Sequence, residues 1–222
     1  HGGAWKEGQK EDMNVYVNLI KKKWKNVAVM NMNYRLASNE KKIHHPEIMS
    51  DIKAAIGHVL NKQKEYHISK NMGIMGASAG GQLAMIYAYK YNDHKNINCA
   101  ASIFGPTIIN DWEWYNSVNL WLGSNVGYIL TEYVGLPWND DVYESVSPYW
   151  NITSESQPTI IFHGSADVIV PVYQSHWMHG KLKELNVPTE YHEYFASHGF
   201  NDTQNEEVVS KMVTFFEKHI KK

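Results

Sequence analysis

The sequence predicts an α/β domain with a mostly parallel central sheet flanked by helices. Helical and extended patterns alternate from about residue 13 to the end of the chain. Strands separated by helices form βαβ units, which set the strands parallel and cover both faces of the sheet. A length of 222 residues fits one domain with a sizeable core, so we expect a single unit over 1–222.

Five stretches carry apolar residues at helical spacing. They are residues 13–24, 47–59, 82–91, 172–185 and 208–220. Pro46 is suited to the first turn of the second stretch, and Asn186 and Pro188 mark the end of the fourth.

Short apolar runs between these helices predict buried strands. The runs are residues 27–32, 71–75, 99–104 and 159–162, and the alternating residues 190–195 add a further strand. Gly105-Pro106 stops the third run. Cys99 is the single cysteine, which excludes an internal disulfide framework, and its apolar surroundings predict a small buried core residue.

The composition excludes several classes of partner. The formal net charge is −2, and the basic residues are scattered apart from Lys21–Lys23, so we expect no nucleic-acid binding. No apolar run approaches the roughly 20 residues that cross a bilayer. The sequence leaves the compartment and the oligomeric state open.

Residues 107–150 interrupt the alternation and have no clear strand. We interpret this stretch as a cap inserted between two core strands. Its aromatic residues are Trp112, Trp114, Tyr115, Trp121, Tyr128, Tyr133, Trp138, Tyr143, Tyr149 and Trp150. Such rings can pack on one another or line a pocket. We expect a mixture, with a small lid whose inner face lines the pocket.

The strongest motif is Gly76-Ala77-Ser78-Ala79-Gly80, between a predicted strand and a predicted helix. A serine hydroxyl is a poor nucleophile unless it is exposed, aimed and given a base. A sharp strand-to-helix turn lifts the hydroxyl above the sheet edge, and its tight backbone admits only small neighbours. The motif alone recurs by chance, so its structural context carries the assignment of Ser78 as a nucleophile.

An acid and a histidine follow two other predicted strands. Asp167 comes after the strand over 159–162, and His198 comes after the strand over 190–195. Open α/β sheets place their ligands at this edge. Alone, either residue would more often be structural. The order Ser78, Asp167, His198 is the order in which a nucleophile elbow is followed by its acid and its base.

The chain opens with the glycine-rich segment His1-Gly2-Gly3-Ala4-Trp5. Acyl transfer requires N–H donors where the oxyanion forms, and glycines let a backbone approach the substrate closely. Without the Ser78 motif, a flexible terminus would be the simpler interpretation.

Taken together, these motifs resemble those of α/β-hydrolase-fold esterases and lipases with an HGG-type oxyanion loop. The resemblance is to the bacterial branch of carboxylesterases and acetyl-xylan or feruloyl esterase-like proteins. The matching segments are His1-Gly2-Gly3, Asn33-Tyr34-Arg35-Leu36, Gly76 to Gly81, Phe104-Gly105-Pro106, Ser147-Pro148, His163-Gly164-Ser165-Ala166-Asp167 and Ser197-His198-Gly199-Phe200. They extend over nearly the whole chain.

The resemblance implies a serine hydrolase that cleaves a small-molecule ester through an acyl-enzyme, without a metal or cofactor. Ser78 would attack the acyl carbon, His198 would carry the proton, and Asp167 would orient His198. The oxyanion donors would be the N–H groups of Gly3, Ala4 and Ala79. In the esterase motif a third glycine often stands where this chain has Ala4.

Two other functions stay open. The pattern His-Gly-Gly-x-Trp, which includes Trp5, is also similar to that of kynurenine formamidases, so an amide or formamide hydrolase or a peptidase on the same fold is an alternative. A non-catalytic binding protein is disfavoured because such a role would not require Ser78, Asp167 and His198 together.

Most of the twelve histidines show no ligand pattern. His176 with His179, and His44 with His45, lack a carboxylate at a familiar ligand spacing, so we expect surface or capping roles. We expect His163 to pack beneath the loop that carries Asp167, which we call the acid loop.

His192 should lie on the last strand, away from its catalytic end. In the resembling fold, a strand that precedes the oxyanion loop lies between those ending near Tyr34 and Met75. We expect residues upstream of His1 to supply it.

Overall fold

The computed structural model describes residues 1–119 and 123–221. Within these residues one parallel sheet has the order β1-β2-β5-β6. Its strands are β1 (Met72–Ala77), β2 (Ile97–Ile103), β5 (Thr159–Gly164) and β6 (Thr189–Tyr194). The four predicted strands from residue 71 onward are thus confirmed within two residues at each start.

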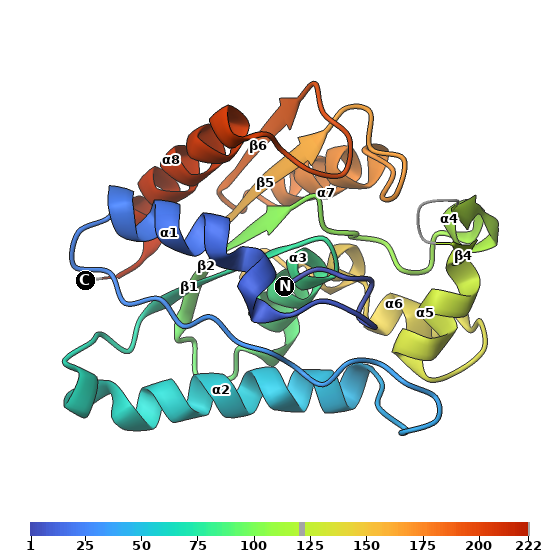
Figure 1. Cartoon of the computed structure of the whole chain (residues 1–222), viewed down its shortest axis with the longest axis horizontal. Helices are drawn as coiled ribbons and strands as arrows, with labels where there is room; N and C mark the ends of the chain where they lie inside the picture. The colour runs from blue at the N-terminus through green and yellow to red at the C-terminus, as the bar shows by residue number, and fades with distance from the viewer. Residues whose placement is uncertain (120–122, 222) are drawn as a thin grey trace.

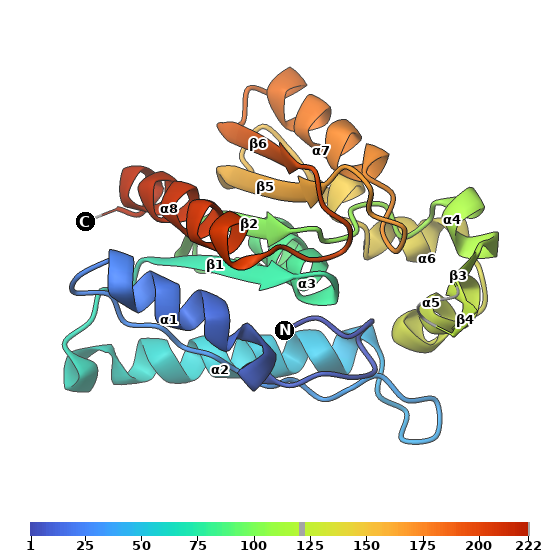
Figure 2. The ribbon, with the colours of Figure 1, turned by 45° about the horizontal axis from the view of Figure 1, so that its top comes forward.

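Helices cover both faces of the sheet (Figures 1 and 2). One face packs against α1 (Asn14–Lys23) and α8 (Asp202–His219), and the other against α2 (His45–Tyr66), α3 (Ala79–Ile86) and α7 (Tyr173–Glu184). A π-helical turn, Tyr87–Tyr91, continues α3. No helix in the described part of the chain is long and apolar enough to span a bilayer.

The alternation of side chains along β2 divides the core between these faces. Cys99 and Ile103 pack toward α1 and α8, whereas Ala100 packs toward α2 and α3. Every residue of β2 is buried, as expected for a strand covered on both sides. Burial raises the pKa of Cys99 to about 12, so the single thiol is an inert core group, as predicted.

The strand predicted over 27–32 is wrong. This segment has no regular secondary structure, and its backbone joins no strand among the described residues. Side-chain bonds hold it instead, because Asn31 Nδ2 donates to Lys10 O (2.6 Å) and Asn33 Oδ1 accepts from Lys10 N (2.7 Å). An apolar run alone therefore does not establish a strand, because a strand also requires a hydrogen-bonded neighbour.

Two helices begin well before their predicted starts. The last helix begins at Asp202 rather than at 208, where Asn201 and Gln204 each accept a hydrogen bond from the other's backbone N–H (2.9 and 3.0 Å). The helix after Ser78 begins at Ala79 rather than at 82. The apolar pattern did not indicate its first turn, because Gly80 and Gly81 have no apolar side chains.

The segment between β2 and β5 is mostly helical. It contains α4 (Trp112–Asn116), α5 (Val126–Val134), α6 (Asp140–Ser145), the 3-10 turn Pro148–Asn151, and a short antiparallel pair of β3 (Val118–Asn119) and β4 (Ser124–Asn125). Helices α4 and α5 lie beyond the carboxyl ends of the strands (Figure 2). Trp112, Tyr115 and Tyr143 pack edge-on or tilted around Trp138. Trp121 lies outside the described residues.

The expected surface or capping role is right for His44 and wrong for His45. His44 caps the start of α2, whereas His45 is buried between Tyr133 of α5 and Tyr91. His45 Nδ1 lies 2.6 Å from the Tyr133 hydroxyl and Nε2 lies 3.0 Å from the Tyr91 hydroxyl. Burial, together with the positive charge of Lys90, lowers the pKa of His45 to about 3.

The fit of Phe216 against Gly73 gives the first prediction. A Cβ on Gly73 would lie 2.4 Å from the Phe216 ring, so Gly73→Ala should lower the free energy of unfolding by about 1–3 kcal/mol through overpacking. Gly57, inside α2, has open space around its Cβ position, so Gly57→Ala should raise that free energy by about 0.5–1 kcal/mol. Urea denaturation measures both changes in the free energy of unfolding. If the two variants changed it by the same amount, Gly73 would not be tightly packed against Phe216.

His45 gives a second prediction, on pH dependence. Between pH 6.5 and 3 the unfolded state binds a proton that folded His45 does not, so the stability of the wild type should fall as the pH is lowered through this window. The slope from this group reaches about 1.4 kcal/mol per pH unit.

Replacement by glutamine should remove the contribution of His45. We expect His45→Gln to flatten the dependence of unfolding free energy on pH between 6 and 4, and the exposed His58→Gln on the same helix to leave it unchanged. An unchanged slope in His45→Gln would show that His45 titrates normally in the folded protein.

Candidate active site

Ser78 occupies the turn between β1 and α3 in a strained backbone conformation. Its φ of 54° and ψ of −124° are rarely adopted by residues with side chains and cost about 1–3 kcal/mol. The Ser78 N–H donates to Ile103 O (2.8 Å), which ties the turn to β2. A Cβ on Gly76 would lie 2.1 Å from Gly80 O, so strand and helix meet backbone to backbone. The small residues of the motif are a steric requirement of this turn.

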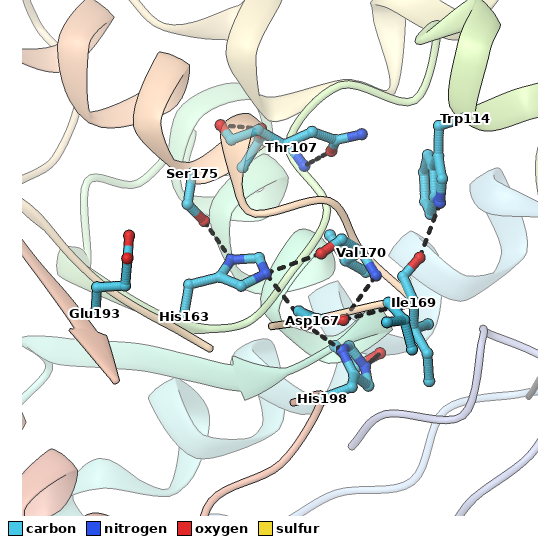
Figure 3. A network of polar contacts seen from close by, with 12 residues as sticks. Thr107, Trp114, His163, Asp167, Ile169, Val170, Ser175, Glu193 and His198 are labelled. Carbon is cyan, nitrogen blue, oxygen red and sulfur yellow. Dashed lines mark hydrogen bonds and ion pairs between the residues drawn. The ribbon is translucent and has the colours of Figure 1, made fainter. Parts of the chain in front are cut away.

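The structure brings Ser78, His198 and Asp167 together at the carboxyl ends of β1, β6 and β5. His198 Nε2 lies 2.9 Å from Ser78 Oγ, and His198 Nδ1 lies 2.6 Å from Asp167 Oδ2 (Figure 3 shows the acid and the histidine). An ionised carboxylate accepts the Nδ1 proton, which leaves Nε2 free to accept from the serine hydroxyl. This is the geometry of a nucleophile with its base and the base's orienting acid.

Four donors surround the fully buried carboxylate of Asp167. Oδ1 accepts from the backbone N–H groups of Ile169 (2.8 Å) and Val170 (3.0 Å), and Oδ2 accepts from His198 and from His163 Nε2 (3.1 Å) (Figure 3). Burial alone would raise the pKa of Asp167, but the hydrogen bonds from His163 and His198 outweigh it and hold that pKa well below its ordinary value. Asp167 is therefore ionised at neutral pH.

His163 lies beneath the acid loop, as predicted, and it also contacts the acid. Its Nδ1 lies 2.6 Å from Ser175 Oγ, and its Nε2 faces both Val170 O (3.0 Å) and Asp167. This contact goes beyond the prediction, and the four-residue spacing between His163 and Asp167 around a tight turn is the sequence signal that could have indicated it. His192 lies on β6 opposite Phe162, as predicted.

The loop over residues 1–8 packs onto the start of α3. A Cβ on Gly80 would lie 2.6 Å from His1 O, and a Cβ on Gly2 would lie 3.1 Å from Ser78 Cβ. The Tyr34 hydroxyl donates to His1 O (2.9 Å), and the two rings stack at 4.2 Å. Only small residues allow this approach, which explains the glycines on both sides of the contact.

Three backbone N–H groups beside Ser78 are available to a ligand. The N–H groups of Gly3, Ala4 and Ala79 donate to no acceptor within the described residues. Ala79 is the first residue of α3, where an N–H has no partner inside the helix and the helix dipole favours negative charge. The three N–H groups predicted as oxyanion donors therefore have no acceptor among the described residues.

Ser78 and His198 line a pocket of about 530 Å³. The loop at Gly3 to Glu7 forms one side. Trp114 of α4 and three residues of α5 form another, and the acid loop closes the third. The α5 residues are Val126, Ile129 and Leu130, and those of the acid loop are Ile169 and Val170. Much of the wall is therefore apolar, as in most small-molecule sites. A volume of this size holds a ligand much larger than a single acetyl group.

A parallel sheet between two helical layers, with a serine on a strained strand-to-helix turn, defines the α/β-hydrolase class. Residues 1–182 match the BD-FAE family, and the chain belongs to this family.

Similar proteins extend the comparison. The chain is 22% identical over 203 residues to Esterase LipC of Mycobacterium tuberculosis (strain ATCC 25618 / H37Rv), covering 83% of this chain and 47% of that protein. The chain thus spans about half the length of this curated relative.

Solved structures of two hydrolases share the fold. The acetyl ester-xyloside bifunctional hydrolase from Caldicellulosiruptor lactoaceticus matches with a TM-score of 0.75 and 23% identity over 98% of this chain and 80% of that chain. Esterase 2 of Thermogutta terrifontis, phosphonylated by sarin, matches with a TM-score of 0.76 and 22% identity over 98% of this chain and 81% of that chain.

Proposed function

We propose that this chain is a serine hydrolase that cleaves carboxylic esters through an acyl-enzyme. Ser78 is the nucleophile, His198 the general base and acid, and Asp167 the residue that orients His198. The continuous line of hydrogen bonds from Ser78 Oγ through His198 to Asp167, at the wall of a 530 Å³ pocket, carries this proposal. Family membership and the esterases among the similar proteins support it.

In the first half of the reaction the Ser78 oxygen forms a bond to the acyl carbon while His198 Nε2 takes the hydroxyl proton. Collapse of the tetrahedral intermediate breaks the bond to the alcohol oxygen, which receives that proton from His198 and leaves. Asp167 stabilises the imidazolium that exists between these two transfers.

In the second half a water molecule attacks the acyl carbon and gives a proton to His198. Breaking the bond to Ser78 Oγ releases the carboxylic acid, and His198 returns its proton to the serine. The sum is one ester and one water converted to one acid and one alcohol, with the protein unchanged.

Negative charge on the acyl oxygen requires donors that are already in place. The free N–H groups of Gly3, Ala4 and Ala79 supply them, and the N-terminus of α3 adds its dipole. One such donor is typically worth about 100-fold to 1,000-fold in rate. Ala4 replaces a glycine without loss of its N–H, and it already adopts a φ of 50°.

The segment over 107–150 acts as a cap in this proposal. Trp114 and the apolar side of α5 face the pocket, while Trp138 and Tyr143 pack among the cap's own rings. One part of the cap therefore binds the substrate and another part stabilises the cap. The apolar side of the pocket, formed by Trp114 and α5, favours a substrate with an apolar group larger than an acetyl group.

The third prediction concerns Ser78→Ala. This change removes the nucleophile, so kcat for a short-chain nitrophenyl ester should fall at least about 1,000-fold. Ser210→Ala on α8, far from the pocket, should retain wild-type activity. Release of nitrophenol measures both, and undiminished activity in Ser78→Ala would refute the role of Ser78.

A fluorophosphonate probe tests whether Ser78 is nucleophilic, and it can be used although the natural ester is not known. We expect the wild type to be labelled and Ser78→Ala to remain unlabelled. A folded wild type that takes no label would favour a binding protein on this scaffold. Faster turnover of N-formylkynurenine or aminoacyl anilides than of esters would favour the amide hydrolase.

A further inference from the structure

We propose that Gln82 is a positioning residue for this reaction. Through Trp5, it holds the loop over residues 1–8 so that the N–H groups of Gly3 and Ala4 stay beside Ser78. The inference rests on the proposed function and adds a residue that does not line the pocket and touches no substrate.

The side chain of Gln82 is fully buried one turn after Ser78 on α3. Its Oε1 accepts from Trp5 Nε1 (3.0 Å) and from the Tyr133 hydroxyl (2.9 Å), and its Nε2 donates to Val146 O (2.7 Å). An indole N–H can only donate and a carbonyl can only accept, so the partners fix the orientation of the amide.

The loop needs such an attachment because its backbone is unfavourable by itself. Gly3, Ala4 and Trp5 have φ values of 104°, 50° and 61°, so three consecutive residues are in the left-handed region. This region is sterically unfavourable for residues with a Cβ, which include Ala4 and Trp5. Contacts outside the loop must therefore hold the conformation in which the N–H groups of Gly3 and Ala4 are free.

Tyr34 holds the loop at His1, and Trp5 makes three further contacts next to Ala4. Its indole donates to Gln82, its ring stacks on Tyr133 at 4.2 Å, and its carbonyl accepts from Ala37 N–H (2.8 Å). Ala4, its neighbour, has only a methyl group. The position of the N–H donors thus depends on how Trp5 is held.

Gln82 connects three parts of the site through one amide group. It belongs to the helix that carries Ser78, it binds the loop through Trp5, and it binds α5 through Tyr133. The face of α5 that includes Ile129 and Leu130 lines the pocket. Without the amide oxygen, the Trp5 N–H would be buried without an acceptor, a state that the loop can relieve by moving. A misplacement of about 1 Å can cost about 100-fold in rate.

Three variants separate positioning from general stabilisation. Gln82→Met removes the acceptor at similar volume, and Trp5→Phe keeps a ring on Tyr133 but removes the donor. Gln82→Glu keeps an acceptor oxygen in either protonation state. Asn92→Leu is the matched control, because it removes an amide that binds both Ile97 N–H and Ile97 O at the opposite end of β2.

We expect Gln82→Met and Trp5→Phe each to lower kcat for nitrophenyl butyrate about 10- to 100-fold, with KM changed less than about threefold. The second-order rate of phosphonylation by a fluorophosphonate should fall to a similar extent. The double variant should be little slower than the slower single variant, because both changes break one hydrogen bond. Gln82→Glu should recover kcat to within about threefold of the wild type.

Active-site titration and thermal unfolding accompany these measurements. Asn92→Leu should lower Tm while its kcat per titrated site stays at the wild-type value. If Gln82→Met lowers Tm but keeps the wild-type kcat per titrated site, or raises only KM, Gln82 is merely structural and the proposal is overturned. If Gln82→Met does not fold, an unchanged kcat in Trp5→Phe overturns it. A wild type that neither hydrolyses esters nor takes the label would instead refute the proposed function.

Discussion

The whole site depends on the close backbone contact between β1 and α3 at the Ser78 turn. Because no side chain fits between Gly76 and Gly80, the helix starts directly above the end of the strand. This brings the Ala79 N–H and the helix dipole next to the Ser78 hydroxyl. The same lack of side chains lets His1 and Gly2 lie against the helix, so one steric condition positions both Ser78 and the loop with the other free N–H groups.

The parallel sheet completes the site by aligning strand ends. Ser78, Asp167 and His198 are far apart in sequence, but each follows a strand whose carboxyl end lies at one edge. The register of β5 with β6 places the acid loop beside the histidine loop, and backbone bonds such as Ala166 N–H to Ala196 O (3.0 Å) join these loops. A regular sheet thereby holds reactive groups that themselves lie on loops.

Sequence patterns predicted the parts of this site that depend on local structure. The four core strands, the turn at Ser78 and the order of acid and histidine follow from runs of neighbouring residues. The prediction of a strand over 27–32 was wrong because strand pairing depends on another segment of the chain. The early starts of α3 and α8 were not predicted because their first turns consist of glycines or polar residues. The contacts of His163, Gln82 and His45 were missed because buried polar side chains are paired across long sequence separations.

The segment that we propose as a cap illustrates the same limit of prediction from sequence. Aromatic content predicted that residues 107–150 would combine self-packing with a pocket wall, and composition could go no further. Only the fold assigns Trp114 to the pocket and Trp138 to the packing of rings. It also shows that α5 has two tasks, because Leu130 lines the pocket while Tyr133 stacks on Trp5.

The anchoring of the loop over residues 1–8 has a consequence for the order in which the molecule assembles and loses activity. Trp5 reaches Gln82 across 77 positions, and Gln82 reaches Tyr133 across 51. Neither contact can form until β1, α3 and α5 are in place, so we expect the loop to become ordered late in folding. The loop can lose these contacts by a local opening that leaves the hydrogen bonds of the sheet intact. If the proposed function is right, such an opening would remove the N–H groups of Gly3 and Ala4 from Ser78 and stop the reaction while the sheet is still folded.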